Sequence, residues 1–267
     1  MTDKPMQPQP KLLTYPLGVG VVAFTTTRLG GVSTGNYASF NINTHCGDRP
    51  EAAESNLRAL ARMLGVEPRH IVMPHQTHGV ELRQIAPEFM TLAPEVRRMV
   101  LEGVDGVMTR EAGVCIGVST ADCIPVLLYD SEHHATAAVH AGWRGTAQRI
   151  VQKAVAGMRL SFGTRPQTVR AIIGPGISME HFEVGDEVYQ QFEEAAFDMR
   201  QIAVRREKWH LDLPGCNRLQ LLEAGIEAAN IHQSAVCTYA QADEYFSARR
   251  LGVASGRLYT GILMKAT

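Results

Sequence analysis

The sequence predicts an α/β (or α+β) fold: a single domain in which a mixed β-sheet is layered with helices. Short apolar runs typical of strands mix with helix-like segments throughout the chain, without strict alternation. The chain has 267 residues, of which 45% are hydrophobic and 20% charged. This suits one large domain with a buried core and excludes a mainly disordered chain. We expect a disordered tail over residues 1–10 and one domain over residues 11–267.

The N-terminal half is expected to begin with a strand and to contain one clear helix. Residues 18–27 have the β-branched and apolar content of a strand, and the glycine-rich stretch after them is typical of a loop. Within the segment 50–65, apolar residues from Leu57 to Leu64 repeat at helical spacing, and Gly65 is a helix stop signal. The other predicted elements of this half are a strand–turn–strand unit over 70–85 and a short strand over 104–109.

The second half carries the longest apolar runs. The predicted strands 114–120 and 124–130 bracket Ala121-Asp122-Cys123, and the segment 135–146 runs from a small-residue strand into a glycine loop. A helix is predicted over 146–163 because its apolar residues fall on one face. The remaining predicted elements are a strand entering a Gly-Pro-Gly turn over 168–178, a helix over 183–197, a strand followed by a helix from near Cys216 over 210–226, and strands over 234–238 and 257–264.

Charge and cysteine content narrow the class of partner and compartment. Lys plus Arg number 26 and Asp plus Glu 27, so the formal net charge is −1 and no basic excess points to nucleic acid or a membrane surface. The N-terminus lacks the apolar segment of a secretory signal, and no apolar run approaches the roughly 20 residues of a membrane span. An odd number of cysteines without a CxxC pair favours a reducing, cytoplasmic location. The cysteines are Cys46, Cys115, Cys123, Cys216 and Cys237.

Three side chains at predicted strand–loop junctions form a candidate metal site: His78, Cys123 and His140. Two imidazoles and one thiolate match a three-ligand transition-metal site with an open fourth position. Zinc there could lower the pKa of a bound water to about 7. From the pattern alone, a buried cysteine and hydrogen-bonded structural histidines are the commoner interpretation, and His75 competes with His78.

Two other kinds of site are also open. The segment HAGWRGT places Arg144 where a strand feeds a helix, which suits anion binding, and Arg28 or Arg249 could add positive charge. A tight turn with solvated arginines is an equal alternative. Neither GxGxxG nor GxxxxGK[ST] occurs at a strand-to-helix junction, which excludes a dinucleotide-binding motif and a phosphate-binding P-loop. Cys123 or Cys237 could instead be a nucleophile activated by a histidine, although an inert or metal-bound cysteine is favoured.

Two carboxylates lie near these segments. Asp122 precedes Cys123, and Asp105 lies in VDGVMT. Either could orient a metal-bound histidine or bind a ribose hydroxyl, but turn capping or surface exposure is slightly favoured. The adjacent His133-His134 is interpreted as a solvated turn.

The motifs TTRLGGVS, SFNINTHCGD, QTHG, DGVMT, STADCIPVLLYD, AAVHAGWRGT, IGPGIS, FEVGDEV, CT and YFSARR occur in this order. Together they resemble the YfiH/laccase-domain family, also called the multicopper polyphenol oxidase and purine nucleoside phosphorylase family. The resemblance runs from about Thr25 to Arg257, and TADC and HAGWRG are its most specific parts. It implies one mixed-sheet domain related to the fold of certain bacterial toxin cysteine hydrolases.

The resemblance also implies a function and a set of site residues. The family's metal triad falls on His78, Cys123 and His140, with zinc as the expected ion. The implied activities are phosphorolysis of adenosine, inosine and methylthioadenosine to the base and ribose 1-phosphate, and deamination of adenosine. Purine nucleoside and phosphate are then the partners, and a monomer or homodimer is expected. Residues matching family motifs at or near substrate are Arg28, Asn41, Arg144, Cys237 and Arg249.

One motif departs from the family. The usual ending FFSYRR is replaced by YFSARR, so that Ala248 stands where an aromatic residue is usual. This puts base stacking or local packing at that position in doubt, whereas the arginines Arg249 and Arg250 are retained.

Three alternatives to the phosphorylase remain. A copper-dependent polyphenol oxidase is compatible with two histidines and one cysteine, but none of the ten histidines forms the HxH pairs of multicopper clusters. A cysteine hydrolase requires an unmetallated thiolate. A regulator that binds nucleotide or metal without turnover is the non-enzymatic alternative.

Overall fold

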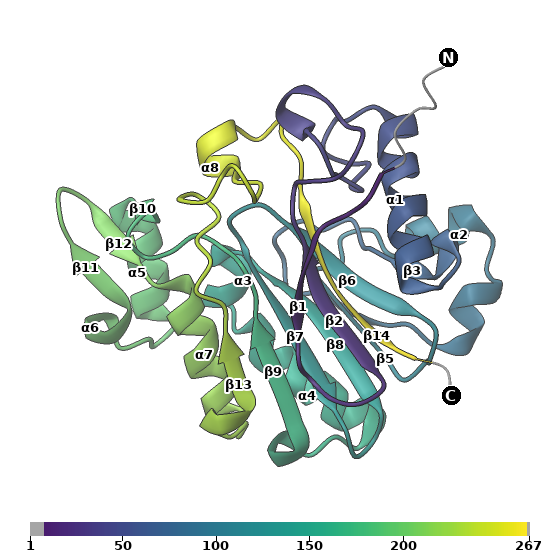
Figure 1. Cartoon of the computed structure of the whole chain (residues 1–267). Coiled ribbons are helices and arrows are strands. Elements are labelled where there is room, and N and C mark those ends of the chain that lie inside the picture. Colours follow the sequence, from purple (N-terminus) through teal and green to yellow (C-terminus); the bar gives the residue numbers. More distant parts are fainter. Residues whose placement is uncertain (1–7, 266–267) are drawn as a thin grey trace.

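In the computed structural model, which describes residues 8–265, two mixed β-sheets pack face to face between helices (Figure 1). The predicted mixed α/β class is confirmed. The strands divide among three sheets, where the sequence predicted one. Apolar content does not show which sheet a strand joins: β6 (Cys115–Thr120), β7 (Ile124–Asp130) and β8 (Ala135–Ala141) are all buried along their whole length, yet β6 belongs to a different sheet from the other two.

The first sheet has five strands and contains the first and the last strand of the described residues. Its three longest strands pair antiparallel, and the short β3 joins β6 in parallel. In spatial order the strands are β1 (Leu12–Tyr15), β2 (Val21–Thr26), β14 (Leu258–Met264), β6 (Cys115–Thr120) and β3 (Ile71–Val72).

The second sheet has six strands and supports the candidate site. Its centre is the antiparallel hairpin β7–β8, in which Ile124 pairs with Ala141 and Asp130 with Ala135. In spatial order the strands are β13 (Ile231–Gln233), β9 (Val169–Ile173), β7 (Ile124–Asp130), β8 (Ala135–Ala141), β5 (Gly106–Thr109) and β4 (Leu82–Gln84).

A third, three-stranded sheet lies at the side of the molecule together with two helices (Figure 1). Its elements are β10 (Glu183–Val184), β12 (Trp209–Leu211), β11 (Ala203–Arg205), α5 (Asp186–Glu194) and α6 (Met199–Ile202). The helix predicted over 183–197 therefore begins only after a short strand.

The other helices cover the outer faces of the two large sheets or connect strands. The predicted helix 50–65 is confirmed as α1, which ends at Gly65 in a left-handed conformation with φ 69°. The remaining α-helices are α2 (Pro94–Val100), α3 (Trp143–Ala147), α4 (Ile150–Phe162), α7 (Leu213–Glu223) and α8 (Ala248–Leu251), and α1 spans Pro50–Leu64. The 3-10 helices are η1 (Gly35–Tyr37), η2 (Pro68–His70), η3 (Pro87–Thr91), η4 (Pro166–Thr168) and η5 (Ala228–Asn230).

Apolar packing occurs in three layers. Between the two large sheets, residues such as Ile116, Leu127 and Ile262 are buried. The layer under α4 and α7 includes the buried Ile150, and the layer under α1 includes the buried Leu60. The central hairpin, which carries the site, therefore packs against apolar residues on both faces. Each fully buried side chain of this kind contributes about 1.5–3 kcal/mol to the stability of the fold relative to an exposed one.

Two predicted elements differ from the structure because tertiary contacts decide them. The helix predicted over 146–163 is broken at Arg149, which has φ 64°. Its guanidinium lies 3.8 Å from the Phe197 ring centroid and donates to the Ala195 carbonyl at 2.7 Å, contacts with a distant segment. The strand predicted over 234–238 is instead β13 just before it, and only Cys237 of that segment forms an isolated bridge.

The predicted tail over residues 1–10 falls mostly on residues 1–7, which lie outside the described residues. Of the part that is described, Gln9 donates its N–H to the Gly30 carbonyl at 2.7 Å, and Pro10 is buried. Among residues 8–265, none of the helices has the length and apolar character needed to cross a bilayer.

Candidate metal centre and its cavity

The three predicted ligand residues meet at one end of the β7–β8 hairpin. Cys123 comes directly before β7, and His140 is the penultimate residue of β8. Because Ile124 pairs with Ala141, the antiparallel register places these two side chains at the same edge of the sheet. His78 reaches the same place from the loop between β3 and β4.

The ligand atoms of His78, Cys123 and His140 all lie within 4.8 Å of one another. The two imidazole rings meet edge to face, with centroids 4.9 Å apart. His140 is buried, Cys123 is half-buried and His78 is exposed, so the cluster is held from below and open on one side. This geometry could hold one metal ion and leave a coordination position toward solvent.

Asp105 organises the cluster from behind, although its side chain is fully buried. Its carboxylate accepts the backbone N–H groups of His78 at 3.0 Å and Gly79 at 2.7 Å, and that of Thr77 at 3.2 Å. It also bonds Nδ1 of His140 at 2.7 Å, which leaves Nε2 of that ring as the free ligand atom. For Asp105 the structure therefore shows histidine orientation. The turn capping or surface exposure slightly favoured from the sequence is wrong here, because the carboxylate is buried against His140.

The electrostatics favour a thiolate in this cluster. Burial alone raises the pKa of the Cys123 thiol, but the charge of His140 and hydrogen bonds with both histidines lower it to about 6. Burial alone lowers the pKa of His140, but the Cys123 charge and the bond to Asp105 raise it. Because the thiolate is the form that binds metals, the protein favours the ligating form of Cys123 at neutral pH.

The backbone around the cluster is shaped to bring its parts close. His78 has φ 62°, a left-handed conformation that is uncommon for residues other than glycine. The bonds from this loop to Asp105 restrain it. At Gly142, a Cβ would lie 3.2 Å from Sγ of Cys123 and 3.0 Å from the ring of His78, so the space beside the ligands depends on glycine.

A cavity of about 260 Å³ opens onto the three ligand side chains. Its other walls come from four separated segments of the chain. Besides His78, Cys123 and His140, it is lined by Asn43, His45, Cys46, Pro74, His75, Gln76, Ser119, Thr120, Ala121, Ala248, Val253 and Arg257.

The predicted substrate-binding residues Arg28 and Asn41 do not line this cavity in the described structure. Arg28 donates to the carbonyls of Ala38 and Ala242 at 2.7 and 2.6 Å. The buried Asn41 accepts the backbone N–H of Arg257 at 3.1 Å, and Arg257 does line the cavity. Asn41 thus does not line the cavity itself but contacts a residue that does.

Three further residues of that predicted set also lie outside the cavity walls: Arg144, Cys237 and Arg249. The guanidinium of Arg144 lies 4.3 Å from the ring centroid of its neighbour Trp143. Sγ of Cys237 accepts the N–H of Ser178 at 3.4 Å. Direct contact of these residues with substrate stays a prediction.

The segments of Cys237 and Arg249 converge on Asp122. Its carboxylate accepts the Thr238 hydroxyl at 2.7 Å and the backbone N–H of Arg249 at 2.7 Å. Asp122 therefore fixes the loop before Cys123 and does not contact the histidine rings through these bonds. The turn capping or surface exposure favoured for Asp122 from the sequence does not describe this position, because the carboxylate is buried and bonds two distant segments.

Sequence reasoning missed several cavity residues. Asn43, His45 and Gln76 lie inside the motifs SFNINTHCGD and QTHG, so those motifs were the available signal. Arg257 follows the last recognised motif and carried no signal of its own. His75, the competitor of His78, does line the cavity but belongs to a different pair, with Glu102.

The family model described as multi-copper polyphenol oxidoreductase laccase matches residues 22–265. The chain belongs to this family. The resemblance predicted from the motifs is thereby confirmed.

Relatives of this laccase-family chain have names of two kinds. A purine nucleoside phosphorylase of Bacteroides thetaiotaomicron is 45% identical over 244 residues, covering 90% of each chain. An adenosine deaminase from an unknown prokaryotic organism is 43% identical over 250 residues, covering 92% of this chain and 95% of that protein.

Solved structures of the family agree with the fold. YfiH of Bacillus licheniformis has a TM-score of 0.88 at 28% sequence identity, covering 96% of this chain and 97% of that one. YlmD of Geobacillus stearothermophilus also has a TM-score of 0.88, at 29% identity, covering 98% of this chain and all of that one, 100%.

Proposed function

We propose that this protein is a zinc-dependent purine nucleoside phosphorylase that also deaminates adenosine. The observation that carries the proposal is the convergence of His78, Cys123 and His140 on one point in an open cavity, with Asp105 orienting His140. The names of the relatives at 45% and 43% identity support the two reactions. Adenosine, inosine and methylthioadenosine are the proposed nucleosides, with phosphate as the second substrate.

The donor set fits zinc. Two imidazole nitrogens and one thiolate are ligands that zinc prefers, and three protein ligands leave a position for a reacting oxygen, as in catalytic zinc sites. We propose that Nε2 of His140, Sγ of Cys123 and a ring nitrogen of His78 hold the ion. When bound, zinc supplies a Lewis acid that polarises an oxygen of phosphate or water.

The chain's own residues then bind and orient the reactants. In phosphorolysis a phosphate oxygen attacks the anomeric carbon while the purine leaves, and positive charge develops on the sugar. Arg257 at the cavity wall contributes a positive charge for phosphate, and Asn41 fixes the backbone of Arg257. In deamination, water takes the place of phosphate and attacks the purine carbon that bears the amino group.

The remaining predicted residues receive roles consistent with their positions. We propose that Arg249 and the segment of Cys237 act through Asp122, which holds the loop of Cys123. Arg28 ties two loops together through backbone carbonyls. Contact of Arg144 with phosphate requires its exposed side chain to turn toward the cavity. A monomer or homodimer and a cytoplasmic location remain predictions.

Metal analysis and product analysis test the proposal together. We expect about one zinc and no copper per chain after native purification. Adenosine with inorganic phosphate should yield adenine and ribose 1-phosphate, and adenosine alone should yield inosine. Intact adenosine under both conditions, with the zinc site filled, would contradict the proposal.

A copper-dependent polyphenol oxidase is the second candidate, favoured by the family's description and by a His₂Cys donor set that also suits copper. Within residues 8–265, however, one group of His, Cys, Asp or Glu side chains is close enough to share an ion, whereas a multicopper oxidase needs several. Stoichiometric copper and oxygen uptake with a phenol would decide for this alternative.

A cysteine hydrolase is the third candidate, and the lowered pKa of Cys123 favours it. It requires the Cys123 thiolate to react while the metal site is loaded. A covalent adduct of Cys123 with a carbonyl probe in metal-replete protein would support it, and protection of Cys123 by metal would oppose it.

A further inference from the structure

The cavity contains a second pair of histidines beside the metal-ligand cluster. The rings of His45 and His75 are stacked, with centroids 4.2 Å apart and planes inclined by 20°. Both residues line the same cavity as His78, Cys123 and His140. The cavity therefore offers imidazole groups that the metal does not require.

The backbone of His75 is fixed relative to the metal-ligand cluster. Its N–H donates to the Leu101 carbonyl at 3.0 Å. The side-chain amide of the next residue, Gln76, forms two bonds with the backbone of Ser119, at 2.8 and 2.7 Å. Three residues after His75, His78 is bonded to Asp105. One short, restrained segment thus positions both His75 and His78.

Glu102 holds the ring of His75 in a defined orientation. Its Oε1 lies 2.7 Å from Nδ1 of His75, and the two side chains are 61% and 39% exposed, respectively. Because the carboxylate occupies Nδ1, Nε2 is the ring nitrogen left free to exchange a proton with a ligand in the cavity. Burial, and to a smaller extent the charge of His75, lowers the pKa of His45, so His45 favours its neutral form.

We infer that His75, positioned by Glu102, is the general acid that protonates the leaving purine; the inference rests on the proposed phosphorolysis. As a phosphate oxygen bonds to the anomeric carbon, the bond from that carbon to the purine breaks. Its electron pair moves into the purine, whose N7 takes the proton from Nε2 of His75. The proton that hydrogen phosphate loses restores His75, so nucleoside and phosphate give base and ribose 1-phosphate without another reactant.

A leaving group that needs no proton isolates this role. The probes are adenosine and 4-nitrophenyl β-D-ribofuranoside, each with inorganic phosphate and the metal-loaded full chain. A positioned general acid contributes about 10²–10⁴-fold. We therefore expect His75→Phe, which keeps a ring at the stack, to lower kcat/KM for adenosine about 100-fold more than for the nitrophenyl riboside. Glu102→Gln should also lower kcat/KM for adenosine more than for the nitrophenyl riboside, but by a smaller factor than His75→Phe.

The controls separate this role from a structural one. His70→Phe changes a histidine outside the cavity lining and should leave both rates as in the wild type. Equal losses on the two substrates in His75→Phe and Glu102→Gln, at wild-type metal content and melting temperature, would overturn the inference and leave the proposed function standing. A wild type that cleaves neither substrate would remove the proposed function and the inference with it.

Discussion

Two Asp–His pairs of nearly equal length lie at opposite ends of the β7–β8 hairpin. At one end, Asp105 bonds Nδ1 of His140 at 2.7 Å. At the other end, where β7 runs into the turn before β8, Asp130 bonds Nδ1 of His133 at 2.8 Å. Both carboxylates are fully buried, and burial opposes a low pKa in each, but hydrogen bonds lower both.

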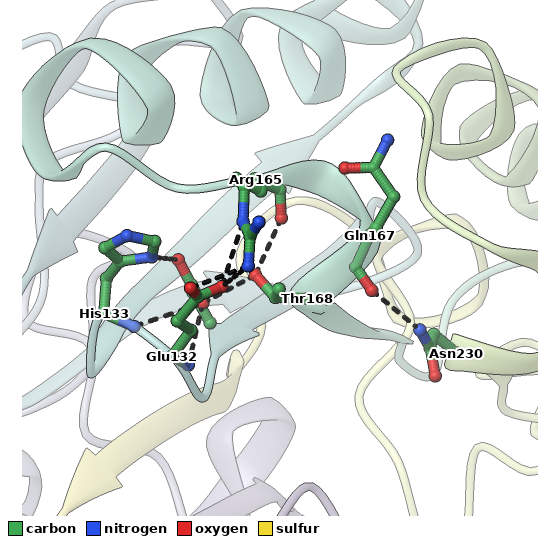
Figure 2. A network of polar contacts seen from close by, with 7 residues as sticks. Glu132, His133, Arg165, Gln167, Thr168 and Asn230 are labelled. Carbon is green, nitrogen blue, oxygen red and sulfur yellow. Dashed lines mark hydrogen bonds and ion pairs between the residues drawn. The ribbon is translucent and has the colours of Figure 1, made fainter.

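The surroundings of the two pairs differ. Asp130 accepts bonds from its own turn, the N–H groups of Glu132 and His133, and from the Thr168 hydroxyl, so it fastens the turn to the end of η4, directly before β9. Figure 2 shows His133 and Thr168 there, beside the ion pair of Glu132 and Arg165. Asp105, by contrast, bonds a histidine whose other nitrogen faces a thiolate in a cavity.

An Asp–His pair therefore does not define a site by itself. What distinguishes the two pairs is the third group: Cys123 lies beside His140 and shares its cavity, whereas Asp130 is bonded by its own turn and by Thr168. The same pair of residue types thus serves ligand orientation at one end and turn stability at the other. Changes at matched positions test this contrast.

The largest expected contrast is between His140→Ala and His133→Ala. The first removes a metal ligand and several kcal/mol of Lewis-acid stabilisation, which corresponds to a loss of about 10³-fold or more in adenosine phosphorolysis. The second should retain metal and activity. Product chromatography and metal analysis measure both, and equal activity of the two variants would refute the division of roles.

The next contrast replaces the carboxylates themselves. Asp105→Asn keeps the shape but no longer stabilises the tautomer of His140 with Nδ1 protonated, and loss of such a partner lowers metal affinity by about 10–100-fold. Asp130→Asn should leave metal affinity unchanged and lower the free energy of unfolding by about 1–3 kcal/mol, because bonds to a buried charge are lost. Competition with a zinc indicator and urea unfolding give the two values. Comparable weakening of zinc binding in both variants would contradict the comparison.

A smaller effect is expected from adding one methyl group beside the ligands. In Gly142→Ala the new Cβ would lie 3.2 Å from Sγ of Cys123, and such overpacking costs about 1–3 kcal/mol. We expect roughly tenfold weaker zinc binding, as 1.4 kcal/mol is tenfold in affinity. Gly157→Ala in α4 is the matched control, since its Cβ meets the flexible end of Met108 and should leave zinc binding unchanged.

The smallest expected effect is a pH dependence of stability at the distal end. Burial alone raises the pKa of Asp130, but hydrogen bonds, among them those from Thr168 and His133, lower it below its ordinary value. A carboxyl group whose pKa is lower in the folded than in the unfolded state adds stability at pH values above about 4. This stability is lost as the pH falls further. Asp130→Asn should therefore reduce the fall in unfolding free energy between about pH 5 and pH 2, measured by urea titration at each pH. An unchanged slope would show that Asp130 does not contribute.

Much of the central fold could be predicted from the sequence because its signals are local. The strands β6, β7 and β8 are buried along their length and therefore read as continuous apolar runs. Helix α1 has a buried stripe at helical spacing and a left-handed Gly65 at its end. The break at Arg149 and the side sheet β10–β12–β11 lacked such signals, because contacts with distant segments determine them.

For the site, the sequence by itself determined the residue types: two histidines and a cysteine within specific motifs, and an aspartate near them. Only the tertiary structure decided which of them act together. The register of β7 with β8 brings Cys123 and His140 to one edge, and Asp105 draws the loop of His78 onto them through backbone N–H bonds. These partners are far apart in sequence, and their meeting depends on strand register and burial, which no local pattern specifies.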